Sequence, residues 1–162
     1  MDKLDPDGID FCLFSDGVSW QYNVHSEAVS EGFEKQVPRG GTILAPVLQQ
    51  IFLKWFDTRS AARRPITVVI VTDGMPSDKR EVLDTIVTAS RRLAEEKGCD
   101  EDIGISFVQV GYDRGAAAFL KELDDDLQDT YGAPFDIVDT VPMTKVAQRG
   151  GVKQVLLDAV ND

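Results

Sequence analysis

The chain has 162 residues, enough for one domain with a single sizeable hydrophobic core. Its 28 acidic and 17 basic residues leave a net charge of −11, which argues against binding to nucleic acid or to an anionic membrane surface. Hydrophobic residues make up 43% of the chain and charged residues 28%, as in an ordinary globular protein. The sequence contains no apolar targeting region and no run of transmembrane length, so we expect a cytoplasmic protein.

Cysteine and histidine usage argues against a zinc site. Cys12 lies in an apolar segment, Cys99 lies in a polar turn, and His25 is the only histidine. The sequence has no closely spaced set of such ligands and no histidine near either cysteine, so we expect neither a zinc site nor a thiol nucleophile. A disulfide is not expected in a cytoplasmic chain.

The N-terminal third predicts a hairpin followed by two helices. An apolar strand at 9–14 precedes alternating β-formers at 18–24, which predict a second strand paired with the first across 15–17. Ser26 begins a predicted helix that runs to residue 36. A second helix is predicted from about Thr42, because apolar residues recur with helical period at Leu44, Val47, Leu48, Ile51, Phe52 and Trp55.

Residues 66–71 predict a buried strand. Four aliphatic residues in a row, Val68 to Val71, are followed abruptly by Thr72, Asp73 and Gly74. A short, unbroken apolar run is typical of a parallel strand that is covered on both faces. Because ligands of open α/β sheets bind at the carboxyl ends of the strands, we expect the functional site at this end.

Beyond this strand we predict, in order, a helix at 78–97, a strand at 103–110, a helix at 116–130, a short strand at 135–138 and a helix at 152–160. Asp78 and Glu81 form a capping-box pattern at the start of the first of these helices. Gly98 is expected to end that helix.

Strands that alternate with helices of this length imply right-handed crossovers, with helices on both faces of one sheet. The predicted fold class is therefore α/β: an open, mostly parallel sheet flanked by helices, Rossmann-like in the broad sense, with one antiparallel edge strand. We expect a single domain over residues 1–162.

Three predicted loops should meet at the carboxyl edge of this sheet, at 15–17, 40–42 and 72–74. Together they offer the carboxylates of Asp16 and Asp73 and several hydroxyl groups. Hard cations such as Mg²⁺ prefer oxygen ligands of this kind. The same residues also have a purely structural interpretation, in which Thr42 caps a helix and the two Asp-Gly pairs form turns.

Two of these loops and the elements around them resemble the von Willebrand factor A domain. The pattern consists of Gly40-Gly41-Thr42 opening an amphipathic helix, followed by an aliphatic strand that ends in Thr72-Asp73-Gly74-Met75-Pro76-Ser77-Asp78. Four further segments, 5–10, 108–111, 119–127 and 136–142, are similar to the intracellular members of the family found in fungi, protists and some bacteria. The resemblance covers nearly the whole chain.

In that family a metal-ion-dependent adhesion site holds Mg²⁺ or Mn²⁺ at the top of the sheet, and an open coordination position accepts a carboxylate of a protein partner. By resemblance, Thr42 matches the metal-coordinating threonine and Asp73 the aspartate, which acts directly or through water. We expect Asp16 and water to complete the metal shell. Partner contact is expected from the neighbouring residues Ser15, Gly41 and Gly74.

The chain departs from the family at its first strand. The family motif Asp-x-Ser-x-Ser, which supplies most of the metal ligands, is missing, and Asp16-Gly17-Val18-Ser19 has the wrong spacing to replace it. We therefore expect weak or absent metal binding and a domain that is N-terminally incomplete. Direct pairing of 9–14 with 66–71 would close the sheet. Such a domain is expected to be marginally stable, oligomeric or a fragment of a longer protein.

Three functions compete. The leading hypothesis is a non-enzymatic, intracellular protein–protein interaction module without nucleic-acid or membrane partners. The alternative is a Mg²⁺-dependent hydrolase of phosphate esters that uses Asp73 and Asp16. Against it, the sequence has no phosphate-binding or nucleophile motif, and the only cation at the three loops is Arg39, directly before Gly40. The third is a scaffold fragment that binds no ligand. We interpret Asp124–Asp126 as a solvated helix face.

Overall fold

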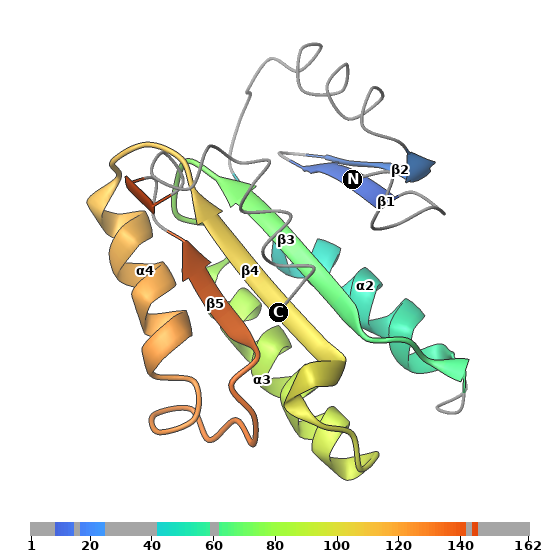
Figure 1. The fold of residues 1–162 in the computed structure, drawn as a ribbon. Coiled ribbons are helices and arrows are strands. Elements are labelled where there is room, and N and C mark those ends of the chain that lie inside the picture. Colours follow the sequence, from blue (N-terminus) through green and yellow to red (C-terminus); the bar gives the residue numbers. More distant parts are fainter. Residues whose placement is uncertain (1–8, 15–16, 25–41, 59–61, 142–143, 146–162) are drawn as a thin grey trace.

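The computed structural model describes residues 9–14, 17–24, 42–58, 62–141 and 144–145 (Figure 1). The helices expected at 26–36 and 152–160 lie outside this part of the chain. Its elements are β1 (Ile9–Phe14), β2 (Val18–Val24), α2 (Ala45–Asp57), β3 (Ile66–Thr72), α3 (Lys79–Glu95), a 3-10 turn (Asp100–Asp102), β4 (Ile103–Gln109), α4 (Arg114–Asp125) and β5 (Val138–Val141). The predicted α/β fold class is confirmed, but the described antiparallel strands form a separate pair and not an edge of the parallel sheet.

β3, β4 and β5 form a parallel sheet with β4 in the middle. β3 pairs with β4 along its full length, from Ile66 opposite Ile103 to Thr72 opposite Gln109. Because parallel neighbours need a crossover connection, α3 links β3 to β4 and α4 links β4 to β5. The carboxyl ends of the strands therefore meet at one edge of the sheet (Figure 1).

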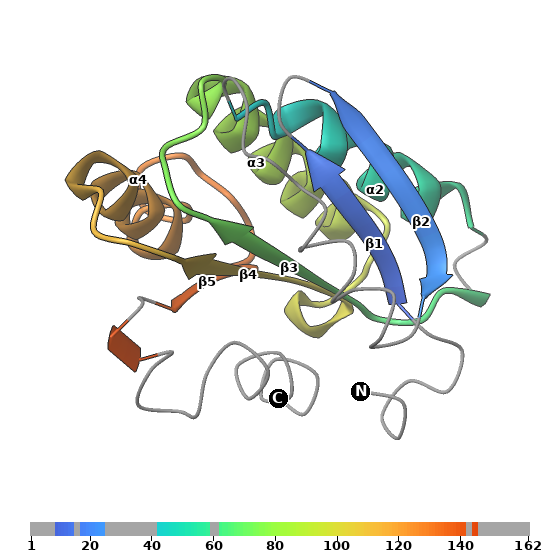
Figure 2. The same cartoon turned by 90° about the horizontal axis from the view of Figure 1, so that it is seen from above.

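Helices α2, α3 and α4 pack on one face of this sheet, so the expected helices on both faces are not found among the described residues (Figure 2). Their buried side chains share one hydrophobic core with the inward residues of the strands, which include Val68, Ile70, Ile105 and Phe107. The opposite face is also apolar, because Val69 and Val71 pack against the fully buried Val108. Apolar residues on both faces agree with the continuous aliphatic run of β3.

β1 and β2 form a separate antiparallel sheet. β1 lies beside β3, with β2 on the outside, in both views (Figures 1 and 2). Among the described strands, however, β1 pairs only with β2 and β3 pairs only with β4. The expected direct pairing of 9–14 with 66–71 is therefore wrong for this part of the chain.

In the described structure this hairpin is held by side chains on α2 and by packing of partly buried apolar side chains against the core, and not by a hydrogen-bond ladder shared with β3. Trp20 Nε1 donates to Gln50 Oε1 at 2.9 Å. Lys54 Nζ lies 3.0 Å from the Asp10 carboxylate and 4.7 Å from the centre of the Tyr22 ring. These contacts attach one face of the hairpin to the helix. No backbone hydrogen bonds between the described strands fix the register of β1 relative to β3.

α4 and β5 differ from their predicted bounds of 116–130 and 135–138: α4 ends at Asp125 and β5 ends at Val141, and nearby side chains decide where each begins. α4 begins at Arg114, before the predicted start at 116, because the Asp113 carboxylate accepts a hydrogen bond from Ala116 N–H at 2.6 Å. β5 begins at Val138, later than the predicted 135. The Ser90 hydroxyl on α3 binds both the N–H and the carbonyl of Phe135, at 3.0 and 3.2 Å, so that residue is not available to the sheet.

The end of α3 also differs in detail from the prediction. Lys97, and not Gly98, adopts the left-handed backbone conformation, with φ of 60°. Gly98 is needed for space instead, because a Cβ atom there would lie 2.3 Å from Leu93 Cδ1. The Gly98 N–H donates to the Leu93 carbonyl at 2.9 Å, which closes the helix.

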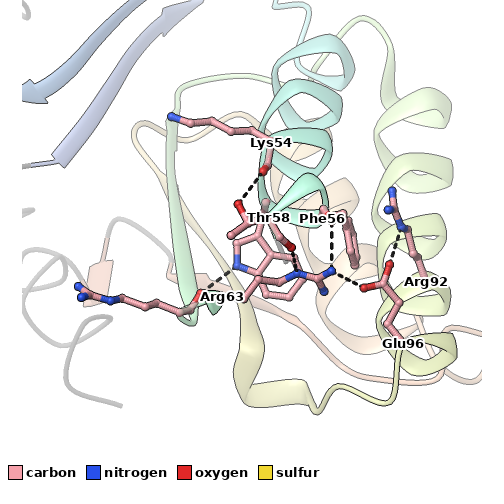
Figure 3. A network of polar contacts seen from close by, with 8 residues as sticks. Lys54, Phe56, Thr58, Arg63, Arg92 and Glu96 are labelled. Atoms are coloured by element: carbon pink, nitrogen blue, oxygen red, sulfur yellow. Dashed lines mark hydrogen bonds and ion pairs between the residues drawn. The ribbon is translucent and has the colours of Figure 1, made fainter. Parts of the chain in front are cut away.

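The connection from α2 to β3 is held by Arg63 (Figure 3). Its Nε donates to the Thr58 carbonyl at 2.9 Å and its Nη2 to the Phe56 carbonyl at 3.1 Å. The same Nη2 forms an ion pair with Glu96, just after α3, at 2.5 Å, and Arg92 Nε binds the other Glu96 oxygen at 3.0 Å. Arg63 thus satisfies carbonyls at the end of α2 and ties that end to α3.

The Glu96 ion pairs should make stability depend on pH in the acid range. Hydrogen bonding from Arg63 is the main reason that the pKa of Glu96 lies below its ordinary value of 4.5. A carboxyl group with a lowered folded pKa stabilises the fold above its ordinary pKa, and this contribution is lost as the pH falls through the folded pKa. We expect wild type to melt above Glu96→Gln at neutral pH and the difference in Tm to shrink below about pH 4.5. A difference that stays constant down to strongly acid pH would contradict this assignment.

None of the described helices is both long and apolar enough to cross a membrane.

Candidate functional site

The carboxyl end of β3 delivers Thr72, Asp73 and Gly74 to the sheet edge, as predicted. The buried Thr72 hydroxyl donates to the Gly74 carbonyl at 2.9 Å, which turns the chain directly after the strand. Asp73 is exposed, and its carboxylate has no hydrogen-bond or ion-pair partner among the described residues. Its oxygens are therefore available to a ligand.

Thr42 is joined to this loop through the backbone. The Ser77 N–H donates to the Thr42 carbonyl at 2.8 Å. The Thr42 side chain is half-buried, and its hydroxyl has no partner in the described part of the chain. A hydroxyl and a carboxylate that lie 31 positions apart in the sequence are thus presented by two adjoining loops.

Asp78 ties the same two loops together through its side chain. Its carboxylate accepts hydrogen bonds from Leu44 N–H at 3.0 and 3.1 Å and from Ala45 N–H at 2.7 Å. Next in the chain, Pro46 has no N–H, and Val47 N–H reaches the Leu44 carbonyl at 3.1 Å. Asp78 therefore satisfies the donors at the start of α2 that no local group satisfies, and its negative charge lies at the positive end of that helix.

This arrangement corrects two predictions about caps. Thr42 does not cap α2, because the N-cap position is Leu44, whose side chain cannot accept a hydrogen bond. Asp78 occupies the N-cap position of α3 but makes no side-chain bond there, so the expected capping box with Glu81 is wrong. The sequence does hold a signal of the true arrangement: Ile43, Leu44 and Ala45 open a helix without any local capping side chain, which indicates that an acceptor comes from elsewhere.

The loop after β4 joins the same edge. The Val110 N–H donates to the Thr72 carbonyl at 2.8 Å, so the backbone pairing of β3 and β4 continues to the start of this loop. Gly111 then takes φ of 88°, a conformation that favours glycine, and Asp113 begins α4. Three loops, 42–44, 72–78 and 110–113, are thus linked by hydrogen bonds into one platform, which we call the edge platform.

The predicted site residues divide into two groups. Thr42, Asp73 and Gly74 lie on the edge platform. The other predicted residues lie outside the described part of the chain, namely Ser15, Asp16 and Gly41. Sequence reasoning missed Asp78 as the residue that holds Thr42 and Asp73 on adjoining loops, since it assigned this carboxylate to its own helix.

The donor set on the edge platform fits a hard cation only in part. A hydroxyl from Thr42 and a carboxylate from Asp73 are oxygen ligands of the kind that Mg²⁺ and Mn²⁺ bind, and Mg²⁺ usually retains several waters. Among the described residues, no group of three or more His, Cys, Asp or Glu side chains could hold a metal ion. Two protein ligands therefore predict weak binding.

Two other features could carry chemistry, and neither shares a residue with the edge platform. Burial raises the pKa of Cys12 to about 11, so that its thiol stays protonated at neutral pH and is a poor nucleophile. A shallow, open depression of about 190 Å³ lies between α3 and the segment after α4, lined by Leu83, Asp84, Val87, Thr88, Arg91 and Tyr131. A polar, open depression of this kind does not resemble an enclosed ligand pocket.

Acidic side chains gather where α4 ends and β5 begins. Burial raises the pKa of Asp124 and Asp136, and repulsion from Asp139 raises both further. Asp125 and Asp126 are exposed, as expected for a solvated face, whereas Asp124 is half-buried. Because α4 starts at the carboxyl edge and runs back along the sheet, the end of this helix lies away from the edge platform (Figure 1).

Removing the Asp78 carboxylate should loosen the edge platform. We expect Asp78→Ala to lower the free energy of unfolding by about 1–3 kcal/mol, because two N–H groups at the start of α2 lose their acceptor. Urea denaturation measures the loss, and amide hydrogen exchange at Leu44 and Ala45 should become faster. Asp113→Ala is the matched control, since it removes a cap within α4 and should leave exchange at these two amides unchanged after correction for global stability. Unchanged exchange in Asp78→Ala would contradict the assignment.

Comparison of the chain with protein-family models and with the curated proteins finds no match.

Proposed function

We propose that the chain is a non-enzymatic protein-binding module of the von Willebrand factor A type that binds Mg²⁺ or Mn²⁺ weakly through Thr42 and Asp73. The main support is that Asp78 and the Ser77–Thr42 bond join two loops at the carboxyl edge of a parallel sheet, and that these loops carry a hydroxyl and a carboxylate without partners in the described structure. In open α/β sheets this edge is where ligands bind.

The bound ion would supply a local positive charge on a chain whose net charge is −11, and a partner carboxylate could coordinate it. Thr42 and Asp73 would hold the ion. The net charge of −11 opposes nucleic acid and anionic membranes as partners. We further propose that the protein acts in the cytoplasm, where its two unpaired cysteines, Cys12 and Cys99, would remain reduced.

Thermal melts with and without metal test the proposal. At a free ion concentration of about one hundred times Kd, a bound ion stabilises the folded state by about 2.7 kcal/mol, which raises Tm by several degrees in a domain of this size. We expect such a rise with Mg²⁺ or Mn²⁺ relative to EDTA. Asp73→Asn should abolish the rise, and in EDTA it should change stability by less than about 0.5 kcal/mol, because Asp73 is exposed.

Asp129→Asn is the matched control, since Asp129 is an exposed aspartate beyond α4 and outside the edge platform. It removes the same charge and should retain the full rise in Tm. A melt that is indifferent to both metals in the wild type would reject the metal-binding part and leave a scaffold without a metal. Turnover of p-nitrophenyl phosphate that requires Mg²⁺ and is lost in Asp73→Asn would reject the non-enzymatic part in favour of a hydrolase.

A further inference from the structure

The outer edge of β3, on the side away from β4, presents unpaired backbone groups. The Thr72 carbonyl accepts a hydrogen bond from Val110 N–H, so the backbone groups of Thr72 point toward β4. Backbone groups of successive strand residues point to alternate sides, so those of Thr67, Val69 and Val71 point away from β4. Among the described strands β3 pairs only with β4, and no other hydrogen bond reaches these three residues there. Each of them therefore offers one donor and one acceptor at this edge.

β3 lacks the features by which proteins usually protect a free strand edge. Protected edges are commonly short, or they carry charged side chains, proline or a bulge. β3 has seven residues, contains no charged residue and no proline, and pairs with β4 without a shift in register. By contrast, β5 at the other side of the sheet has four residues and carries Asp139. β1 carries Asp10 and has a shift in register after Ile9. The edge of β3 is thus suited to pairing with a further strand.

Both faces of β3 are apolar. Val68 and Ile70 belong to the core that the sheet shares with the helices. On the other face, Val69 and Val71 pack against Val108 and are only half-buried. Side chains of a strand alternate between the two faces, so a strand added beside β3 would place its side chains next to both apolar rows. Such a strand must therefore be apolar on both faces.

The hairpin limits what can reach this edge. β1 lies beside β3 in both views (Figures 1 and 2). Cα atoms of the two strands are nearly all more than 8 Å apart, whereas hydrogen-bonded strands lie about 4.8 Å apart. The polar contacts that hold the hairpin go from Trp20 and Asp10 to α2 and involve no residue of β3. A single extended segment is therefore a better occupant than the edge of a second complete sheet, which would meet the hairpin.

We propose that the outer edge of β3 binds an extended segment of another protein as an added strand, through main-chain hydrogen bonds to Thr67, Val69 and Val71. In this mode of recognition, main-chain bonds supply affinity and alternate side chains supply specificity. The segment is rich in β-branched and aliphatic residues and has no proline at the paired positions. It carries no run of acidic residues, because a chain with a net charge of −11 would repel them. This binding needs neither a metal ion nor the edge platform.

Selection of short random peptides displayed on phage, carried out on the full chain in EDTA, supplies a defined probe. The most enriched peptide is synthesised with a fluorophore, and its affinity is measured by fluorescence anisotropy. Thr67→Pro removes an outward N–H but no bond to β4, and it should weaken binding by about tenfold or more. Thr67→Ala is the matched control, because it retains the N–H and changes only an exposed side chain. It should change affinity by less than about twofold.

Amide hydrogen exchange of the wild type gives a second measurement that does not depend on the folding of a variant. Saturating peptide should slow exchange at Thr67, Val69 and Val71 by about tenfold or more, after correction for global stability. The amides of Val68 and Ile70 point toward β4 and should change much less. Circular dichroism melts establish whether Thr67→Pro retains the fold, and the exchange pattern decides the matter if it does not.

Three results would overturn the inference. The first is a selection that enriches no peptide. The second is an enriched peptide that binds folded Thr67→Pro as tightly as wild type, or that leaves exchange at the three outward amides unchanged. The third is a dimer, seen by light scattering, that Thr67→Pro abolishes, because a second copy of the chain would then occupy the edge. Asp73→Asn should leave peptide binding unchanged, so the failure of the metal site and the failure of this inference are seen separately.

Discussion

Phe107→Ala should lower the free energy of unfolding by about 3–5 kcal/mol, the largest single effect that we expect in this protein. Phe107 is fully buried in β4, the middle strand of the parallel sheet, opposite Ile70 on one side and Thr140 on the other. Its ring belongs to the core that the sheet shares with α2, α3 and α4. Alanine would lose the burial of the ring and leave a cavity. The cavity would persist because β4 is held between β3 and β5 and cannot move to fill it.

Urea denaturation followed by circular dichroism measures this loss, provided that the transition is cooperative. Tyr112→Ala is the matched control, because it removes an aromatic ring that is almost fully exposed and follows the same strand by three residues. We expect the control to change stability by less than about 0.5 kcal/mol. If Phe107→Ala lowers the free energy of unfolding by less than about 1 kcal/mol, packing around the parallel sheet is not the main source of stability in this chain.

Arg63→Ala should lower the free energy of unfolding by about 2–3 kcal/mol, the second largest effect. Only 12% of the Arg63 side chain is exposed, and its guanidinium lies 4.7 Å from the centre of the Trp55 ring. The substitution removes the hydrogen bonds to Thr58 and Phe56, the ion pair with Glu96 and this ring contact (Figure 3). The end of α2 would then lose its link to α3.

Arg64→Ala is a close control, since Arg64 is the next residue and its side chain is exposed. Among the described residues, Arg64 forms a hydrogen bond only through its carbonyl, which accepts from Trp55 Nε1 at 2.9 Å, and alanine retains that carbonyl. We expect this control to lie within about 0.5 kcal/mol of wild type. Arg63→Lys should recover less than half of the loss, because an ammonium group cannot donate to carbonyls and a carboxylate in the planar arrangement of a guanidinium. Full recovery with lysine would show that charge alone matters here.

Local patterns determined the type of nearly every described element. The hairpin strands at 9–14 and 18–24 have the predicted bounds, because period-two alternation and turn residues act within a few positions. The helical stripe from Leu44 to Trp55 gave α2 its buried face, and the aliphatic run placed β3 in a parallel sheet. The position of Asp73 at the carboxyl edge followed from the same information, since a parallel strand can end only at that edge.

Contacts between distant residues decided what the patterns could not. The expected pairing of β1 with β3 depended on long-range register, which no local periodicity encodes, and in the described structure α2 holds the hairpin instead. The start of β5 depended on Ser90, which is 45 positions away from Phe135.

The candidate site shows the same division. The sequence by itself determined that a hydroxyl, a carboxylate and a glycine stand at the ends of strands and loops that converge. Tertiary structure alone decided that Asp78 caps α2 and not its own helix, across a separation of 33 positions. The physical reason is that helix propensity and periodicity act over one or two turns, whereas an unsatisfied N–H at a helix end can donate to any carboxylate that the fold brings within reach.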